Sequence, residues 1–235
     1  MTLTIVLLPG LHGTGDLFEP LLAAAPPDVR PVVISLPPIG TYAELFEYLR
    51  ARMPAEGKFA ILGESFSGPL AIEIAKDQPE RVAAVILSNS FVSPPRWRLF
   101  RFLPWSLLFS IRPPEWIVRW LFVGRRAPDH VVTAVCDAIA NAPRRILAAR
   151  MREVFSLPEP DGRSGIAAPL LALTGSLDVF VTPDTSELHR IAETVVIRKI
   201  AAPHLLLQGA PQAAWTEIVA FLADHVDASI SHRPA

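Results

Sequence analysis

Short apolar runs alternate with longer amphipathic stretches along this chain, and this alternation limits how it can fold. Runs that are apolar throughout indicate strands covered on both faces, as in a parallel sheet. The pattern therefore predicts a doubly wound α/β fold, with a mostly parallel sheet of about six strands. The expected strands are Thr4–Leu8, Pro31–Leu36, Lys58–Leu62, Ala83–Leu87, Leu170–Thr174 and Val195–Ile200. The expected helices are Leu17–Ala25, Thr41–Arg52, Gly68–Asp77, Asp184–Ile191 and Gln212–Asp224.

One long stretch departs from this rhythm. From about Phe91 to Pro160 the chain is apolar and rich in proline, but no run in it has the character of a strand. Because the stretch falls between two expected strands, we interpret residues 91–160 as an inserted helical cap. Residues 1–90 and 161–235 would then form the core, and the polar end from Ala228 is expected to fray.

Composition excludes several classes of protein. The chain has 235 residues, of which 51% are hydrophobic and 19% charged, so we expect one folded domain rather than disorder. A net charge of −1 gives no general attraction to nucleic acid. Cys136 is the only cysteine, which favours a reducing compartment, with a cysteine-poor secreted protein as the alternative. We expect neither a signal peptide nor a transmembrane helix, and a cytoplasmic location.

The segment Gly63–Gly68 indicates a possible reactive serine. It follows an apolar run and precedes a helical stretch, and Ser65 lies between small residues. This arrangement is typical of a nucleophile elbow, a strained strand-to-helix turn that leaves little room for side chains. Ser67 occupies the position where a second glycine is usual, and it is the alternative nucleophile. A helix cap is the simpler interpretation of Ser65.

A serine nucleophile needs a base to take its proton and an acid to orient that base. Asp178 comes four residues after the expected strand that ends at Thr174, and His204 follows the last expected strand. Strand ends of this kind form the ligand crevice of an open α/β sheet. Asp184 is the competing acid, although its place at a helix start indicates a cap. The segment after the fourth strand, Ser88–Ser90, has no acid, which favours Asp178.

The remaining histidines compete with His204 for the role of base. His189 and His225 fall in amphipathic helices, where we expect solvated faces, and His130 lies in the cap. His12 lies beside a glycine-rich loop, where it either lines a pocket or has a structural role in the loop.

The glycine-rich loop Leu8–Gly15 follows the first expected strand and can supply backbone donors for an oxyanion. We expect the amides of Leu11 and Phe66 to form this oxyanion hole. Phe66 directly follows the candidate nucleophile, where the start of a helix adds partial positive charge.

Four pieces in order carry a family resemblance: the loop at Pro9-Gly10, the elbow around Ser65, the turn at Thr174–Asp178, and Pro203-His204. In these pieces the chain resembles the α/β-hydrolase superfamily over nearly its whole length. The sheet would be a version trimmed at the N-terminus, because it begins at what is usually the third strand. Many members carry His-Gly where this chain has Pro9-Gly10, which leaves open which amide completes the oxyanion hole.

The resemblance implies esterase, lipase, thioesterase or related acyl chemistry, without a metal or organic cofactor. The expected reaction is the hydrolysis of a small-molecule ester or thioester by Ser65, His204 and Asp178 through an acyl-enzyme. The alternatives on the same fold are an acyltransferase and a carbon–carbon bond hydrolase or lyase. A non-catalytic ligand- or membrane-binding protein is the alternative from another class.

The expected cap is rich in aromatic and basic residues. Between Phe91 and Arg126, seven arginines face one acid, Glu115, which gives a local charge of +6. This mixture suits a membrane interface or an anionic, greasy substrate. The simpler interpretation is a lid whose aromatic rings pack on the core while its arginines stay in water. Beyond an ester substrate, the candidate partners are a membrane or micelle surface and a second copy of the chain.

In either case we expect the cap to line an apolar acyl pocket. Four of the five tryptophans fall in it, and with His12 they are the candidate substrate-binding residues: Trp97, Trp105, Trp116 and Trp120.

Overall fold

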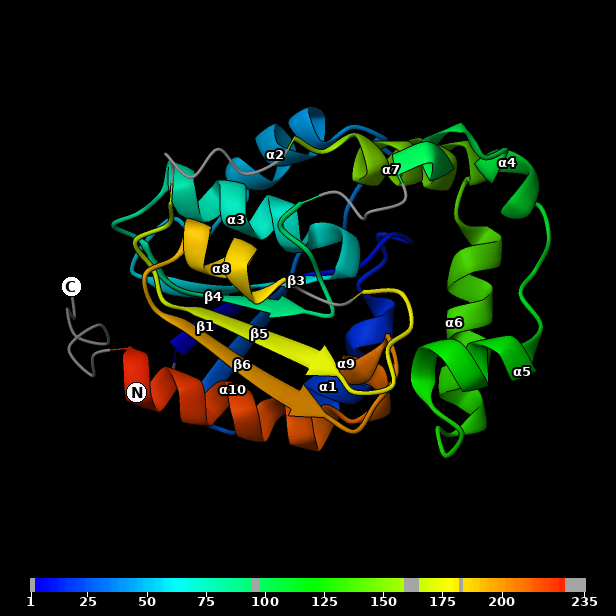
Figure 1. Cartoon of the computed structure of the whole chain (residues 1–235). Coiled ribbons are helices and arrows are strands. Elements are labelled where there is room, and N and C mark those ends of the chain that lie inside the picture. Colours follow the sequence, from blue (N-terminus) through cyan, green and yellow to red (C-terminus); the bar gives the residue numbers. More distant parts are fainter. Residues whose placement is uncertain (1–2, 94–97, 159–164, 182–183, 227–235) are drawn as a thin grey trace.

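The computed structural model describes residues 3–93, 98–158, 165–181 and 184–226. Six parallel strands form one sheet in the order β2-β1-β3-β4-β5-β6 (Figure 1). This order, with the helices that join the strands, confirms the expected doubly wound α/β fold. The strands are β1 (Leu3–Leu8), β2 (Val29–Val33), β3 (Phe59–Glu64), β4 (Val82–Ser88), β5 (Leu170–Gly175) and β6 (Val195–Ile200).

Helices cover both faces of the sheet, so alternate side chains of each strand enter two separate cores. In β1, Val6 and Leu8 enter one core, whereas Ile5 and Leu7 enter the other. The first core contains side chains of α2 (Tyr42–Arg50), α3 (Gly68–Asp77) and α8 (Thr185–Ile191). The second contains side chains of α1 (Glu19–Ala23), α9 (Leu206–Gly209) and α10 (Pro211–His225).

The ends of several elements differ from the sequence-based expectation. β2 begins two residues before the expected Pro31 and pairs only with β1, and an edge strand tolerates a proline. The expected helix Leu17–Ala25 is divided into a 3₁₀ turn, η1 (Asp16–Phe18), and α1. Thr41 caps α2 instead of beginning it, since its side chain accepts a hydrogen bond from the Glu44 amide.

The described residues between β4 and β5 contain helices and no strand. We call residues 98–158 the inserted segment. Its elements are η3 (Arg98–Phe102), α4 (Trp105–Leu108), α5 (Glu115–Ile117), the π-helix η4 (Val118–Val123), α6 (Asp129–Asn141) and α7 (Arg144–Ser156).

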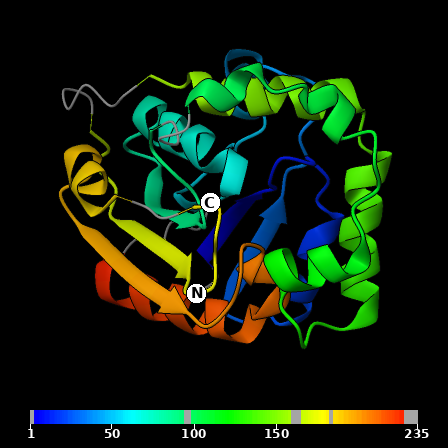
Figure 2. The same ribbon diagram turned by 45° about the vertical axis from the view of Figure 1, so that its right-hand side comes forward.

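The inserted segment has a small hydrophobic cluster of its own. Val118, Val132 and Cys136 pack there with Leu17 of η1 and with Leu205, which directly precedes α9. Figure 2 shows the segment as an arch of helices beside the carboxyl ends of the strands. None of the helices in the described residues is long and apolar enough to cross a bilayer.

Candidate active site

Ser65 occupies a sharp turn between β3 and α3. Its φ angle is +48°, a left-handed conformation that a residue with a side chain rarely adopts. The turn brings backbone so close that a Cβ on Gly63 would lie 2.6 Å from the Ser67 carbonyl oxygen. A Cβ on Gly68 would lie 1.9 Å from Ser90 Oγ. The crowded positions that require glycine are therefore Gly63 and Gly68, and the elbow accommodates a serine at position 67.

Ser67 has a structural role in this turn. It is fully buried, and its hydroxyl donates a hydrogen bond to the carbonyl oxygen of Pro9 at 2.5 Å. This bond ties the elbow to the loop after β1. Ser65, in contrast, is partly accessible and lines a cavity.

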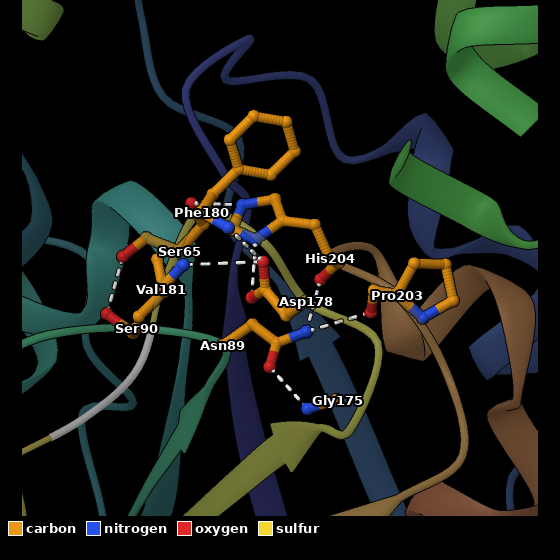
Figure 3. Close-up of polar contacts among 9 residues, drawn as sticks. All are labelled: Ser65, Asn89, Ser90, Gly175, Asp178, Phe180, Val181, Pro203 and His204. Atoms are coloured by element: carbon orange, nitrogen blue, oxygen red, sulfur yellow. Dashed lines mark hydrogen bonds and ion pairs between the residues drawn. The ribbon is translucent and has the colours of Figure 1, made fainter. Parts of the chain in front are cut away.

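The structure brings Ser65, His204 and Asp178 into one hydrogen-bonded chain (Figure 3). Ser65 Oγ lies 2.9 Å from Nε2 of His204, and Nδ1 of the same ring lies 2.8 Å from Asp178 Oδ2. The three side chains come from the carboxyl ends of β3, β6 and β5, where an open α/β sheet gathers functional groups. This arrangement has the connections that a serine nucleophile, a base and an orienting acid require.

The carboxylate of Asp178 is held in one orientation. Its side chain is fully buried, and its second oxygen, Oδ1, accepts hydrogen bonds from the amides of Phe180 and Val181. The competing acid, Asp184, lies instead at the N-cap of α8, where its side chain accepts a hydrogen bond from the Ser186 amide. Hydrogen bonds from Ser186 lower the pKa of Asp184, as expected for an exposed cap.

Asn89 was not among the sequence candidates, yet it joins the two loops that carry the acid and the histidine (Figure 3). Its Nδ2 donates to the carbonyl oxygens of Pro203 and His204, at 3.0 and 2.6 Å. Its Oδ1 accepts from the Gly175 amide at 2.6 Å. Asn89 has a φ of +42°, which asparagine tolerates better than most residues. The only signal in the sequence was a polar residue at the end of a buried strand.

Glu64 connects the elbow to two further loops. It is buried, its Oε2 accepts from the Gly10 amide at 3.2 Å, and its Oε1 accepts from Gln208 Nε2 at 2.9 Å. Burial raises the pKa of Glu64, and the hydrogen bonds from Gln208 and Gly10 oppose that rise. The residue therefore ties the loop after β1 to α9, the turn that follows His204.

Leu11 and Phe66, whose amides are expected to form an oxyanion hole, line the same cavity as Ser65. The Leu11 N–H has no hydrogen-bond partner within the part of the chain that the structure describes. Phe66 lies in the 3₁₀ turn Ser65–Ser67 that leads into α3, where backbone N–H groups point out of the helix end. Tyr42 holds Phe66 in place: its hydroxyl donates to the Phe66 carbonyl at 2.9 Å, and the two rings stack with centroids 4.7 Å apart.

His12 is a neutral imidazole at the wall of the same cavity. Its Nδ1 accepts a hydrogen bond from the Thr14 amide at 3.2 Å, so the ring proton is assigned to Nε2. Burial, reinforced by the positive charge of Arg150, lowers the pKa of His12 to about 4. Its buried Nε2 has no hydrogen-bond partner among the described residues.

Arg150 of α7 is a buried cation beside the loop after β1. Its guanidinium donates to three backbone carbonyl oxygens, those of Leu11, Pro37 and Ile39, at 2.7 to 3.0 Å. Burial lowers the pKa of Arg150 to about 10, so the side chain stays charged at neutral pH. The positive charge lies near the Phe66 ring, 5.5 Å from its centroid.

A cavity of about 540 Å³ opens above Ser65. Its polar side chains are those of Ser65, His204 and His12, and the rest of its wall is largely apolar. The inserted segment supplies much of that wall: Phe100, Trp105, Phe109, Phe122, Val135, Ile139, Leu147, Met151, Val154 and Phe155. A site of this composition suits a small molecule with a large apolar part and one polar reacting group.

The structure brings only some of the predicted substrate-binding residues to this cavity. His12 and Trp105 line it. Trp116 and Trp120 do not, and their side chains are exposed to solvent. Trp97 lies outside the described residues. In the described ranges no cluster of three or more His, Cys, Asp or Glu side chains could hold a metal ion.

No family model matches the sequence, and no curated protein matches it. Many solved structures match its fold. An enol-lactonase from Burkholderia xenovorans LB400 is 18% identical with a TM-score of 0.74, and covers 95% of this chain and 92% of its own. A hydrolase from Pseudomonas aeruginosa PA01 is 19% identical with a TM-score of 0.77, and the match covers 94% of this chain and 90% of the hydrolase. An esterase from Thermogutta terrifontis is 19% identical with a TM-score of 0.74, and the match covers 96% of this chain and 91% of the esterase.

These likenesses extend over nearly the whole chain, and they confirm the resemblance that the motifs indicated. The chain has the α/β-hydrolase fold.

Proposed function

We propose that this protein is a serine hydrolase that cleaves carboxylic esters with an apolar acyl group. The observation that carries the proposal is the chain Ser65–His204–Asp178, with contacts of 2.9 and 2.8 Å, at the floor of a largely apolar cavity. Solved structures of the same fold include a lactonase and an esterase, which supports acyl chemistry. Fold alone does not decide the reaction, so the proposal depends on the site.

In the first half of the reaction, Ser65 Oγ attacks the acyl carbonyl carbon while Nε2 of His204 takes its proton. Asp178 holds Nδ1 of His204 protonated and stabilises the imidazolium that forms. The negative charge that develops on the carbonyl oxygen is bound by the Leu11 and Phe66 amides. Each such donor contributes roughly 3–4 kcal/mol to the transition state.

His204 then donates its proton to the leaving alcohol, which departs and leaves the acyl group on Ser65. In the second half, a water molecule gives its proton to the same nitrogen and attacks the acyl-enzyme. Collapse of that intermediate returns the proton to Ser65 and releases the carboxylic acid. A thioester would follow the same steps with a thiol as leaving group.

The apolar lining of the cavity favours an apolar acyl group over a charged one. Among the described residues that line it, none has a carboxylate, lysine or arginine side chain. A charged substrate group would lose its hydration there without gaining an ionic partner. The inserted segment supplies the wall opposite Ser65, which is the role we propose for it as a cap.

Two measurements test the proposal. Ser65→Ala should abolish labelling by a fluorophosphonate probe and lower the turnover of activated esters by several orders of magnitude, on the order of 10⁶ in a complete triad. Ser67→Ala is the matched control within the same turn. This variant should still be labelled, and the peptide that carries the probe should contain it on Ser65. Labelling of Ser67→Ala but not of Ser65→Ala supports the assignment, whereas unchanged ester turnover in Ser65→Ala contradicts it.

Product analysis separates hydrolysis from the alternatives on this fold. With an ester substrate and an added alcohol acceptor, a hydrolase releases mainly the free acid. Preferential transfer to the alcohol would instead identify an acyltransferase. If the wild-type protein neither reacts with the probe nor cleaves esters, a ligand-binding protein becomes the better interpretation.

A further inference from the structure

The inserted segment also carries exposed apolar side chains that do not line the cavity. Six large apolar side chains between residues 99 and 120 are each 58% to 78% exposed. We call this set the outer apolar face, and it consists of Leu99, Phe102, Leu107, Ile111, Trp116 and Trp120. In Figure 1, α4, α5 and the loop that joins them form the edge of the molecule farthest from helices α8 and α10. Six such side chains close together in sequence are unusual on a protein that meets only water.

The elements that carry this face are apolar on both sides. In α4 and the residue after it, Trp105 and Phe109 line the cavity, whereas Leu107 faces solvent. In η4, Phe122 lines the cavity and Trp120 is exposed. A helix that is apolar all round is normally buried on every side. Packing against the core explains only the inner side of these short helices, so the outer side needs another apolar environment.

The inserted segment that carries the outer apolar face has an excess of positive charge. Residues 98–158 contain ten arginines and four acids, a net charge of +6 in a chain whose total is −1. Two arginines are paired across the segment, Arg112 with Asp137 and Arg119 with Asp129. Others lie over exposed rings: the Arg101 guanidinium carbon is 4.6 Å from the centre of the Phe102 ring, and that of Arg125 is 4.5 Å from Trp120.

We propose that the outer apolar face docks on an anionic lipid surface and lies in its interface. Large apolar side chains would enter the boundary between headgroups and acyl chains, while nearby arginines bind the anionic headgroups. Charge argues against a second copy of the chain on the same face, because two segments of net charge +6 would meet and repel. The docking does not depend on the proposed function, since it uses none of the catalytic side chains.

Docking would place the outer wall of the cavity at the lipid surface. The same short helices form part of that wall and carry the outer face, so along them a single helix separates the cavity from the interface. The rim also includes Val179 and Phe180, which are exposed and line the cavity. If the proposed function holds, the substrate class becomes an ester that dissolves in the lipid surface.

Vesicle flotation of the full-length protein tests the docking. We expect at least about tenfold stronger binding to phosphatidylcholine vesicles with about 30% phosphatidylglycerol than to pure phosphatidylcholine, and weaker binding at high salt. Ser65→Ala should bind as well as wild type, which separates docking from catalysis. Equal weak binding of wild type to both vesicles overturns the proposal.

Variants then locate the surface. Leu107→Ser with Trp116→Ser should lower binding at least about tenfold, since both side chains would lose their lipid contacts. The matched control is Val219→Ser, which removes a partly exposed apolar side chain from α10. Arg101→Gln with Arg125→Gln should reduce the preference for anionic vesicles, with the exposed Arg198→Gln as control. If the Leu107/Trp116 variant instead dissociates a dimer and leaves vesicle binding unchanged, the face pairs two copies of the chain and the lipid proposal is wrong.

Discussion

The guanidinium of Arg150 donates a hydrogen bond to the carbonyl oxygen of Leu11, with a Nη1–O distance of 2.7 Å. The two residues are 139 positions apart, one in α7 of the inserted segment and the other in the loop after β1. The bond fixes the peptide that follows Leu11 and, through the same guanidinium, the loop at Pro37 and Ile39. The inserted segment therefore helps to position Leu11, whose N–H is one of the donors in the proposed oxyanion hole.

Replacing Arg150 should harm both stability and turnover. In Arg150→Met, three partly buried carbonyl oxygens lose their donor, which should lower the free energy of unfolding by about 3 kcal/mol. Because the Leu11 amide loses its support, kcat for an ester should fall at least roughly tenfold while KM changes little. The exposed Arg152→Met is the control. Urea denaturation and steady-state kinetics measure both effects, and a normal kcat in folded Arg150→Met would contradict this role.

Asn89 should be needed for the geometry of the acid and the histidine. Asn89→Ala removes two bonds to the His204 loop and one from Gly175, and leaves alanine at a φ of +42°. We expect a loss of about 2–4 kcal/mol in stability and a fall in kcat of roughly tenfold or more. Asn141→Ala, at the exposed end of α6, is the control. Full activity of folded Asn89→Ala would show that the two loops hold their positions without it.

Much of the framework could be predicted from sequence, because apolar strands and their polar ends leave a local pattern. Ser65, Asp178 and His204 follow such strands, and chain order was enough to group them. Arg150 and Asn89 could not be found in this way, since each contacts loops more than 80 residues away and neither is part of a local pattern. Trp116 and Trp120 were expected to line the cavity but are exposed to solvent. Their helices carry apolar residues on both sides, so the sequence pattern does not show which side faces the cavity.

His12 should make stability depend on pH. Its pKa is about 4 when folded and 6.5 in an unfolded chain, so the unfolded state binds more protons between these values. Stability therefore falls as pH decreases through that window, by about 2 kcal/mol from pH 7 to pH 5. His12→Asn does not titrate and keeps an acceptor near Nδ1, so it should lose less stability over the same range. Urea denaturation at both pH values measures the difference, and parallel losses in the two proteins would contradict the buried neutral imidazole.

Substitutions at Gly68 and Ser90 should compensate for each other, because the two residues are in close contact. Gly68→Ala places a Cβ 1.9 Å from Ser90 Oγ, which should displace the elbow and greatly reduce folding or activity. Ser90→Gly removes the clashing atoms, although it also removes the 2.5 Å hydrogen bond from Ser90 to the Ser65 carbonyl. The double variant should therefore be more stable than Gly68→Ala alone. A double-mutant cycle in urea measures this coupling, and additive losses would show that the elbow avoids the clash in another way.

Met151 should help to set which acyl groups fit the cavity. It lies on α7, lines the cavity of about 540 Å³, and is only partly buried, so its side chain can change size without disrupting the main core. Met151→Trp should fill part of the space and lower kcat/KM for long acyl esters at least roughly tenfold more than for acetyl esters, because it leaves the proposed triad untouched. Met151→Ala should shift the preference toward longer chains. A p-nitrophenyl ester series measures both variants, with Met53→Leu, at a buried residue that does not line the cavity, as the control. Equal changes for short and long esters would mean that Met151 affects the triad rather than the acyl site, and the acyl chain would then have to lie along another wall of the cavity.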